Sequence, residues 1–486
     1  MNKKILITSL VAACAFGAVA VGGTYALFTS KAEVGSIAVT TGKVHYAATI
    51  DAASLKTYSM DVEQQVAGTF ECGGTAAIDG NALTLSKLTP GDKVTFTINI
   101  TNTSTIKTRY RVSVKNTSGA NPFQLTGAAA SWIAVDAETN PDAAEISLEL
   151  PKDAGNEYQG QTYTLTVELE AMQYNALTDV SSADALTAAL TDGKSVALTQ
   201  DVTLSSKAFA NKDVDIDLDG HNLTVSGDFP VEANAGHDVT IKNGTIVVPA
   251  EHAKSAVLYV NGGKLSLEGV TLAEEDDQPK DHVPVQATHG TLEIVDSTIS
   301  TNHYYVIATN NAVAENGPLS IRVENSNLKA ANDEKDNCAI LCNTNFATNL
   351  EIKNSIITSD RQALILRTGT AVAEDTTFVT TATYLESEAH KTINNTYLTG
   401  SWKSGNEVAV AAVVIGDTSA SAYNLNAAMT MKNCTLEAAH KDLGAKKVVM
   451  ASDGTYAASL TADAASIAEG DIAKIGDPAK ITVTFA

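Results

Sequence analysis

The sequence predicts an all-β protein in which an antiparallel sandwich is followed by a right-handed parallel β-helix. Within residues 27–176, apolar and polar side chains alternate in several short runs, which is the period of half-buried strands. Within residues 195–486, one strand-and-turn unit recurs roughly every 20–30 residues, the spacing of a repeat architecture. We expect a signal peptide over residues 1–26 and a linker with a capping helix over residues 177–194.

Residues 1–26 have the parts of a secretory signal: two early lysines, an apolar core and small residues at the end. Cleavage is expected between Ala26 and Leu27, and Ser30–Ala32 offers a second small-x-small site. The apolar run over residues 5–23 is also nearly long enough to span a bilayer, so an uncleaved anchor is the alternative.

Charge and cysteine content narrow the function classes. The net charge of −23 excludes a nucleic-acid partner, because a polyanion requires a basic face. Cys14 lies in a loosely lipobox-like context, which leaves lipidation as a further alternative. The other four cysteines are too few for a disulfide framework. Cys338 and Cys342 stand too far apart on an extended strand to bridge each other.

The sandwich is predicted from four alternating runs. The turn around Pro90 and Gly91 precedes the first of them, because proline presets φ and glycine accepts a positive φ. Several such strands without helical periodicity indicate two packed antiparallel sheets. The inward positions are Val94, Phe96, Ile98 and Ile100; Tyr110, Val112 and Val114; Ile146, Leu148 and Leu150; and Tyr163, Leu165, Val167, Leu169 and Ala171.

Three stretches of this first part carry a family resemblance: GGTYALFTSKAEV, LTLSKLTPGDKVTFTINITNTS and LTVELEAMQYNAL. They resemble, in the same order, the TasA/camelysin family of exported biofilm-matrix proteins. The resemblance implies cleavage after Ala26 by a SipW-type signal peptidase, a jelly-roll sandwich, and an extracellular or cell-surface location in a Gram-positive bacterium. It also implies assembly into fibres, with further copies or related matrix subunits as partners.

In such fibres the freed N-terminal segment of one subunit completes a sheet of the next. The extended apolar residues Val34, Ile37 and Val39 are the expected donor strand, because an extended segment can exchange main-chain hydrogen bonds with a sheet edge. The alternative is that this strand pairs within its own sandwich. Camelysin-like proteins have been described as metallopeptidases, but the nine histidines include no HExxH pair, so peptidase activity is not expected.

The connector is predicted to hold one helix over Ser181–Gly193. Ser182 or Ser181 can cap it, Leu186 and Leu190 share one face, and a glycine ends it. An amphipathic helix before a repeat array can cover the open apolar end of that array. A hinge between the domains is the competing interpretation.

The repeat array resembles the pectin-lyase-like β-helix superfamily in pattern, without its catalytic signature. Each unit places one aliphatic or aromatic residue after a turn, and these residues are expected to stack inside. Asn243, Asn354 and Asn433 each follow a lysine at equivalent positions, where asparagine tolerates left-handed backbone at a corner. The expected stack is Leu204, Leu223, Ile246, Leu272, Ile299, Leu328, Ile357, Phe378, Leu398 and Leu436.

Two acidic clusters are candidate calcium sites, and no other cofactor is expected. Asp213, Asp215, Asp217 and Asp219 alternate with apolar residues, which places four carboxylates on one outward face. The alternative is a charged early rung that blocks edge-to-edge pairing. The acidic run Glu274–His282 either binds a cation or solvates a turn.

Exposed aromatic residues of the array can stack on sugar rings, and the candidates for glycan binding are Tyr304, Tyr305 and Trp402. The sequence therefore predicts a surface or matrix structural protein with a rod for adhesion or glycan binding, and not an enzyme. The alternative is a carbohydrate-active enzyme, a polysaccharide lyase or glycoside hydrolase. The lyase groups available are Arg322, Asp360, Arg361 and Arg367.

Overall fold

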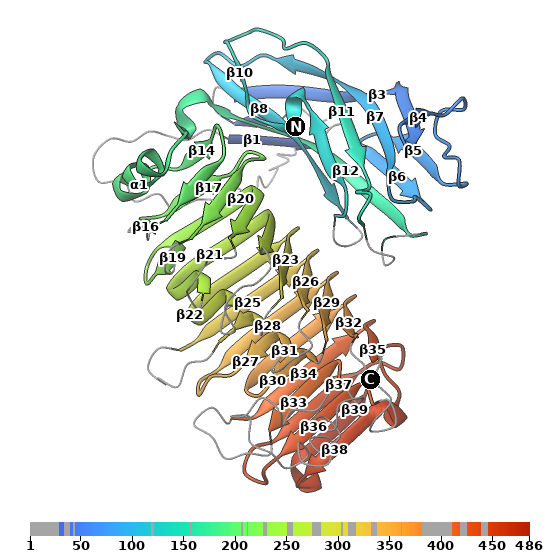
Figure 1. Ribbon diagram of the computed structural model, residues 1–486, viewed down its shortest axis with the longest axis vertical. Coiled ribbons are helices and arrows are strands. Elements are labelled where there is room, and N and C mark those ends of the chain that lie inside the picture. The colour runs from blue at the N-terminus through green and yellow to red at the C-terminus, as the bar shows by residue number, and fades with distance from the viewer. Residues whose placement is uncertain are drawn as a thin grey trace, which may run out of the picture.

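The computed structural model of the chain is all-β, with antiparallel sheets near the N-terminus and a large parallel sheet consistent with a β-helix (Figure 1). It describes residues 29–33, 39–41, 44–117, 121–154, 158, 160–205, 208–210, 212–226, 231–249, 256–274, 283–302, 305–309, 317–331, 338–360, 362–381, 411–417, 425–438 and 446–486. The predicted cleavage site at Ala26 and Leu27 lies outside these residues.

Two six-stranded antiparallel sheets form the N-terminal domain. In the first, β12 is flanked by β8 on one edge and by β6 and β1 on the other; its strands are β1 (Thr29–Glu33), β5 (Thr75–Asp79), β6 (Ala82–Ser86), β8 (Thr108–Asn116), β10 (Ile133–Val135) and β12 (Thr162–Gln173). The second contains β2 (Val39–Thr41), β3 (Val44–Ser59), β4 (Val62–Glu63), β7 (Asp92–Asn102), β9 (Gln124–Gly127) and β11 (Ala144–Glu149). Short 3-10 turns are η1 (Ala128–Ala130) and η3 (Tyr174–Ala176).

The predicted inward residues of this domain are confirmed. All fifteen positions of the four alternating runs are buried, and they join one apolar core that both sheets contribute to. The outward residues of the first sheet, among them Arg109, Arg111 and Glu170, therefore point away from this core.

The connector helix is also confirmed, as α1 (Ala183–Asp192). Ser182 caps it by accepting a hydrogen bond from the Ala185 amide, and Gly193 ends it in the left-handed region at φ 71°. Its buried side chains join the core of the parallel sheet. The linker boundary needs correction, because β13 (Thr178–Val180) already pairs in parallel with β14 (Val196–Leu198) and so belongs to the large parallel sheet.

The parallel sheet winds so that most strands pair with the strand three places further along the chain, which gives three strands per turn. Its strands are β13, β14 (Val196–Leu198), β15 (Val202–Leu204), β16 (Ala208–Ala210), β17 (Val214–Asp217), β18 (Asn222–Val225), β19 (Val231–Asn234), β20 (Asp238–Val248), β21 (Ala256–Glu274), β22 (Val283–Val295), β23 (Thr298–Thr301), β24 (Tyr305–Ala308), β25 (Leu319–Glu324), β26 (Asn327–Ala330), β27 (Cys338–Cys342), β28 (Thr348–Lys353), β29 (Ile356–Ser359), β30 (Gln362–Leu366), β31 (Gly369–Glu374), β32 (Thr377–Thr380), β33 (Val413–Asp417), β34 (Ala427–Lys432), β35 (Thr435–Ala438), β36 (Val448–Ser452), β37 (Ala458–Ala462), β38 (Ile472–Gly476) and β39 (Ile481–Phe485), with short turns η8 (Glu469–Asp471) and η9 (Pro478–Lys480).

The predicted aliphatic stack is largely confirmed by the strand register. Seven successive pairings join Leu223, Ile246, Leu272, Ile299, Leu328, Ile357, Phe378 and Leu436, and all eight side chains are buried. One predicted member is wrong: Val202, rather than Leu204, pairs with Leu223. Phe378 pairs directly with Leu436, and the predicted member Leu398 lies outside the described residues.

In the three repeats that contain a lysine–asparagine step, the corner at the asparagine adopts left-handed backbone, as predicted. Asn243, Asn354 and Asn433 have φ values of 60°, 48° and 52°. Aspartates fill the same corner on other turns, and Asn325 Nδ2 donates to Asp296 Oδ1 at 3.1 Å. Short polar side chains are favoured here because they tolerate this backbone and can bond along the stack.

A column of buried hydroxyls lies next to this corner. The amide of Ser297 donates to Ser326 Oγ at 3.1 Å, and the amide of Ser326 donates to Ser355 Oγ at 3.1 Å. All three side chains are buried, so the column satisfies amides that the turn would otherwise leave unpaired.

Cys338 and Cys342 are both buried on β27 and form no disulfide with each other, in keeping with the prediction. Within the described ranges, no helix is long and apolar enough to cross a membrane.

Candidate functional site

The expectation of four solvent-facing aspartates is wrong at its C-terminal end. Asp213 and Asp215 do lie toward solvent, but the Asp217 side chain is fully buried and Asp219 is largely covered. The reason is that the sandwich packs against the first turns of the β-helix, which a single strand's alternation cannot reveal.

The calcium expectation gains no support from the geometry. Among the described residues, no group of three or more histidine, cysteine or acidic side chains is placed to hold a metal ion. Asp213 instead accepts a hydrogen bond from the Asp238 amide at 3.0 Å. Of the second acidic cluster, Glu274 ends β21 and the rest lies outside the described residues.

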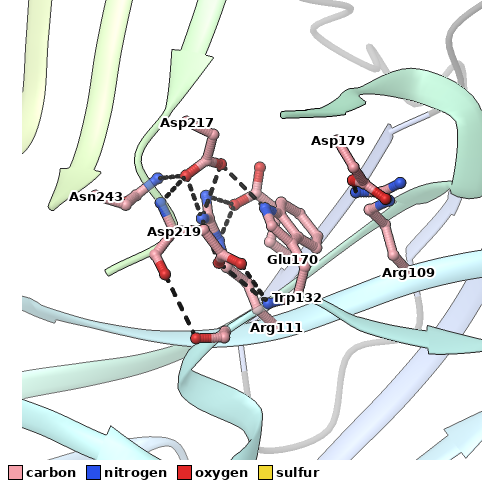
Figure 2. Close-up of polar contacts among 9 residues, drawn as sticks. Arg109, Arg111, Trp132, Glu170, Asp179, Asp217, Asp219 and Asn243 are labelled. Atoms are coloured by element: carbon pink, nitrogen blue, oxygen red, sulfur yellow. Dashed lines mark hydrogen bonds and ion pairs between the residues drawn. The ribbon is translucent and has the colours of Figure 1, made fainter. Parts of the chain in front are cut away.

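The centre of the junction is Arg111, whose side chain is only 4% exposed (Figure 2). Its Nη2 lies 2.8 Å from Glu170 Oε2 on the neighbouring strand of the sandwich, and its Nη1 lies 2.8 Å from Asp217 Oδ2 of the β-helix. The guanidinium also stacks on the ring of Trp132, with 4.3 Å between its carbon and the ring centroid. One buried cation thus joins the two domains.

Trp132 adds two hydrogen bonds across the same boundary. Its indole Nε1 donates to Asp217 Oδ2 at 3.1 Å, and its backbone amide donates to Asp219 Oδ1 at 3.1 Å (Figure 2). From the β-helix side, Asn243 Nδ2 and the Asp219 amide both donate to Asp217 Oδ1. The buried Asp217 carboxylate is therefore fully supplied with donors, as burial of a charge requires.

Three carboxylates share this one guanidinium, and the imbalance shows in the pKa of Asp219. Burial and the neighbouring charge of Asp217 raise the pKa of Asp219 from its ordinary value of 3.8 to about 7, and the weaker opposing effects come from Arg111 and the Trp132 amide. Burial opposes the charge of Arg111, but Asp217 and Glu170 outweigh it and raise the pKa of the guanidinium.

Further contacts surround this cluster. Arg109 Nη1 lies 2.9 Å from Asp179 Oδ1 (Figure 2), and Met172, Leu177 and Ala197 form a small apolar cluster against which Trp132 packs. Further along the rod, Asn327 Nδ2 donates to the Tyr158 hydroxyl at 2.6 Å. The sandwich is therefore fixed to the β-helix at more than one place.

The N-terminal segment pairs within its own chain. Thr29–Glu33 runs antiparallel to residues 168–172 of β12, and Val39 lies in β2, which pairs with β3. Val34 and Ile37 lie outside the described residues. The segment thus adds a strand to each of the two sheets.

The glycan and lyase candidates are not brought into one site. Tyr305 is half-buried against a separate cluster of buried apolar residues, and Tyr304 and Trp402 lie outside the described residues. Each lyase candidate that the structure describes has a local partner of its own: Arg322 pairs with Glu324, Asp360 accepts from Thr381, and Arg367 donates to Asn343. Arg361 lies outside the described residues.

Comparison with models of known protein families, with curated proteins and with solved structures finds no match to this chain.

Proposed function

We propose that this chain is an exported structural protein of the cell surface or biofilm matrix, similar to TasA and camelysin. Its sandwich is a jelly roll that assembles by strand donation, and its right-handed β-helix is a rod for adhesion or glycan binding. The observation that carries the proposal is the position of β1, which fills part of one edge of β12.

The edge that β1 covers is well suited to exchange. β6 pairs with residues 162–166 of β12 and β1 with residues 168–172, while β8 occupies the opposite edge. Removal of β1 leaves five residues of main-chain donors and acceptors open on a central strand. Such an edge recruits any extended segment of matching register.

A second copy of the chain supplies the matching segment. When identical elements are exchanged between subunits, each contact inside the sheet is replaced by the same contact, so the cost is mainly that of association. In an open chain of subunits each copy donates its strand to the next, so the contact is head-to-tail rather than two-fold symmetric. Repetition of such a non-closing contact produces a fibre.

The rod is carried by this assembly because the junction fixes it to the sandwich. The buried Arg111 cluster and the Asn327–Tyr158 hydrogen bond hold the two domains together at separate places. Each subunit of a fibre would then present its β-helix in the same orientation. A regular display of rods is useful for adhesion, and the exposed face of the rod is where a glycan would bind.

The test compares filament formation by three chains that begin at residue 27: the unchanged sequence, Lys31→Pro and Lys31→Ala. A proline within β1 removes a main-chain donor and is excluded from paired strand interiors, whereas alanine retains the ladder. We expect filaments from the unchanged and alanine chains in negative-stain microscopy and sedimentation, and none from the proline chain. Filaments from all three chains, or filaments from none of them, would contradict strand donation.

A further inference from the structure

We propose that the junction between the sandwich and the β-helix is a proton-operated latch, in which protonation of the Asp219 carboxyl group tightens the contact. The basis is a cluster in which Glu170, Asp217 and Asp219 converge on the single guanidinium of Arg111. This latch is independent of whether the chain forms fibres.

The distances show which carboxylate is in excess. Arg111 makes its close contacts, both at 2.8 Å, with Glu170 and Asp217, and its Nη1 lies 3.9 Å from Asp219 Oδ1. Because the guanidinium bonds the first two carboxylates at 2.8 Å and lies 3.9 Å from the third, the negative charge of Asp219 is neutralised less completely than theirs. A negative charge that is buried beside another carboxylate disfavours the closed junction.

The groups that face Asp219 come from each neighbouring element. The sandwich contributes Arg111 and, further away, Arg109, which is already paired with Asp179; it also contributes the Trp132 amide. The β-helix contributes Asp217. A protonated Asp219 keeps its carbonyl oxygen as an acceptor for the Trp132 amide and no longer repels Asp217. Protonation therefore retains the hydrogen bond and removes the cost.

The titration range supports this mechanism. Burial and Asp217 raise the pKa of Asp219 to about 7 in the closed junction, and opening to water would return it toward 3.8. Because the closed junction binds this proton more tightly than the open one, low pH favours the closed form. The ratio of closed to open forms should fall about tenfold per pH unit between about 4 and 7 and level off above 7.

The intrinsic fluorescence of Trp132 reports on the latch directly, because its indole lies within the cluster. The chain contains two tryptophans, so the measurement uses full-length protein with Trp402→Phe. We expect a one-proton change of emission with a midpoint near pH 7, accompanied by a broader distribution of domain orientations in small-angle scattering at pH 8. With Asp219→Asn, the emission and scattering at pH 8 should match those of the unchanged residue at pH 5.5.

Asparagine is a suitable substitution because Asn243 and Asn354 adopt similar left-handed backbone at the corners of later turns. Asp219→Gly, which also tolerates positive φ, is the second variant if the first fails to fold. His221 lies two residues away, so His221→Gln is the matched control and should keep the step. The proposal is overturned if no step occurs near pH 7, if the step survives in both Asp219 variants, or if it is lost in His221→Gln. A midpoint that moves between chelator and millimolar calcium would assign the change to metal binding instead and would also overturn it.

Discussion

At the residue scale, the contact with Arg111 explains why Asp217 and Asp219 are covered while Asp213 lies toward solvent. The sequence predicted the alternation on both sides: Tyr110 and Val112 point inward, so Arg111 points outward, and Asp217 lies on the outer face of its own strand. Their meeting could not be predicted, because 106 residues and a domain boundary separate them. The sequence did contain one signal of this contact: outward arginines on one strand and alternating aspartates on another, in a chain of net charge −23.

Loss of the Arg111 charge should weaken the protein strongly. Arg111→Met leaves the carboxylates of Glu170 and Asp217 buried without their cation, which typically costs about 3–5 kcal/mol. The matched control is Arg109→Met, since its partner Asp179 has a side chain that is 45% exposed and remains hydrated. Urea unfolding followed by circular dichroism should show a clearly larger loss for the first variant. Equal losses would mean that the Arg111 cluster is no stronger than its neighbour.

Titration of Asp219 should make the folded protein less stable as the pH rises. Its pKa is raised in the folded protein, so its contribution to stability is fully present below the ordinary value of 3.8 and is lost as pH rises through about 7. Asp219→Asn should therefore raise the melting temperature at pH 8 and change it little at pH 4.5. Calorimetry at the two pH values checks this, and a variant that is less stable at pH 8 would contradict it.

At the element scale, local patterns were sufficient where one strand or helix determines its own structure. The caps of α1 and the left-handed asparagine corners follow from single residue types, and the register of the aliphatic stack follows from the repeat. The exception has a physical reason. Leu204 fits the local pattern, but its place in the stack depends on which residue lies opposite on the next strand, and Val202 is the residue that pairs with Leu223.

The hydroxyl column was not predicted, and it provides a test of the corner. Ser326→Ala removes the acceptor for the buried Ser297 amide, and an unpaired buried donor costs about 1–3 kcal/mol. The control is Ser320→Ala on the outward side of β25, which should change the free energy of unfolding by no more than about 0.5 kcal/mol. Thermal denaturation of the two variants distinguishes them, and equal effects would show that the column does not stabilise the turns.

At the scale of the whole molecule, the rod and the sandwich form a continuous arrangement in which the sandwich lies at the N-terminal end of the β-helix (Figure 1). The fold class followed from periodicity, whereas the contact between the domains required the structure. The same limit applies to β1: its extended sequence indicated a strand, but its place on β12 depends on an edge formed by residues more than a hundred positions later.

The most direct measurement of strand donation uses the pairing of Ser30 with Ala171. Facing positions on paired strands lie within reach of a disulfide, so chains carrying Ser30→Cys and chains carrying Ala171→Cys are mixed, both with the exposed Cys72 replaced by serine. Under oxidation, strand donation predicts a disulfide between the two kinds of chain, and long covalent ladders from the double variant alone. A double variant that closes only within single chains, together with a mixture that forms no linked pair, would contradict it.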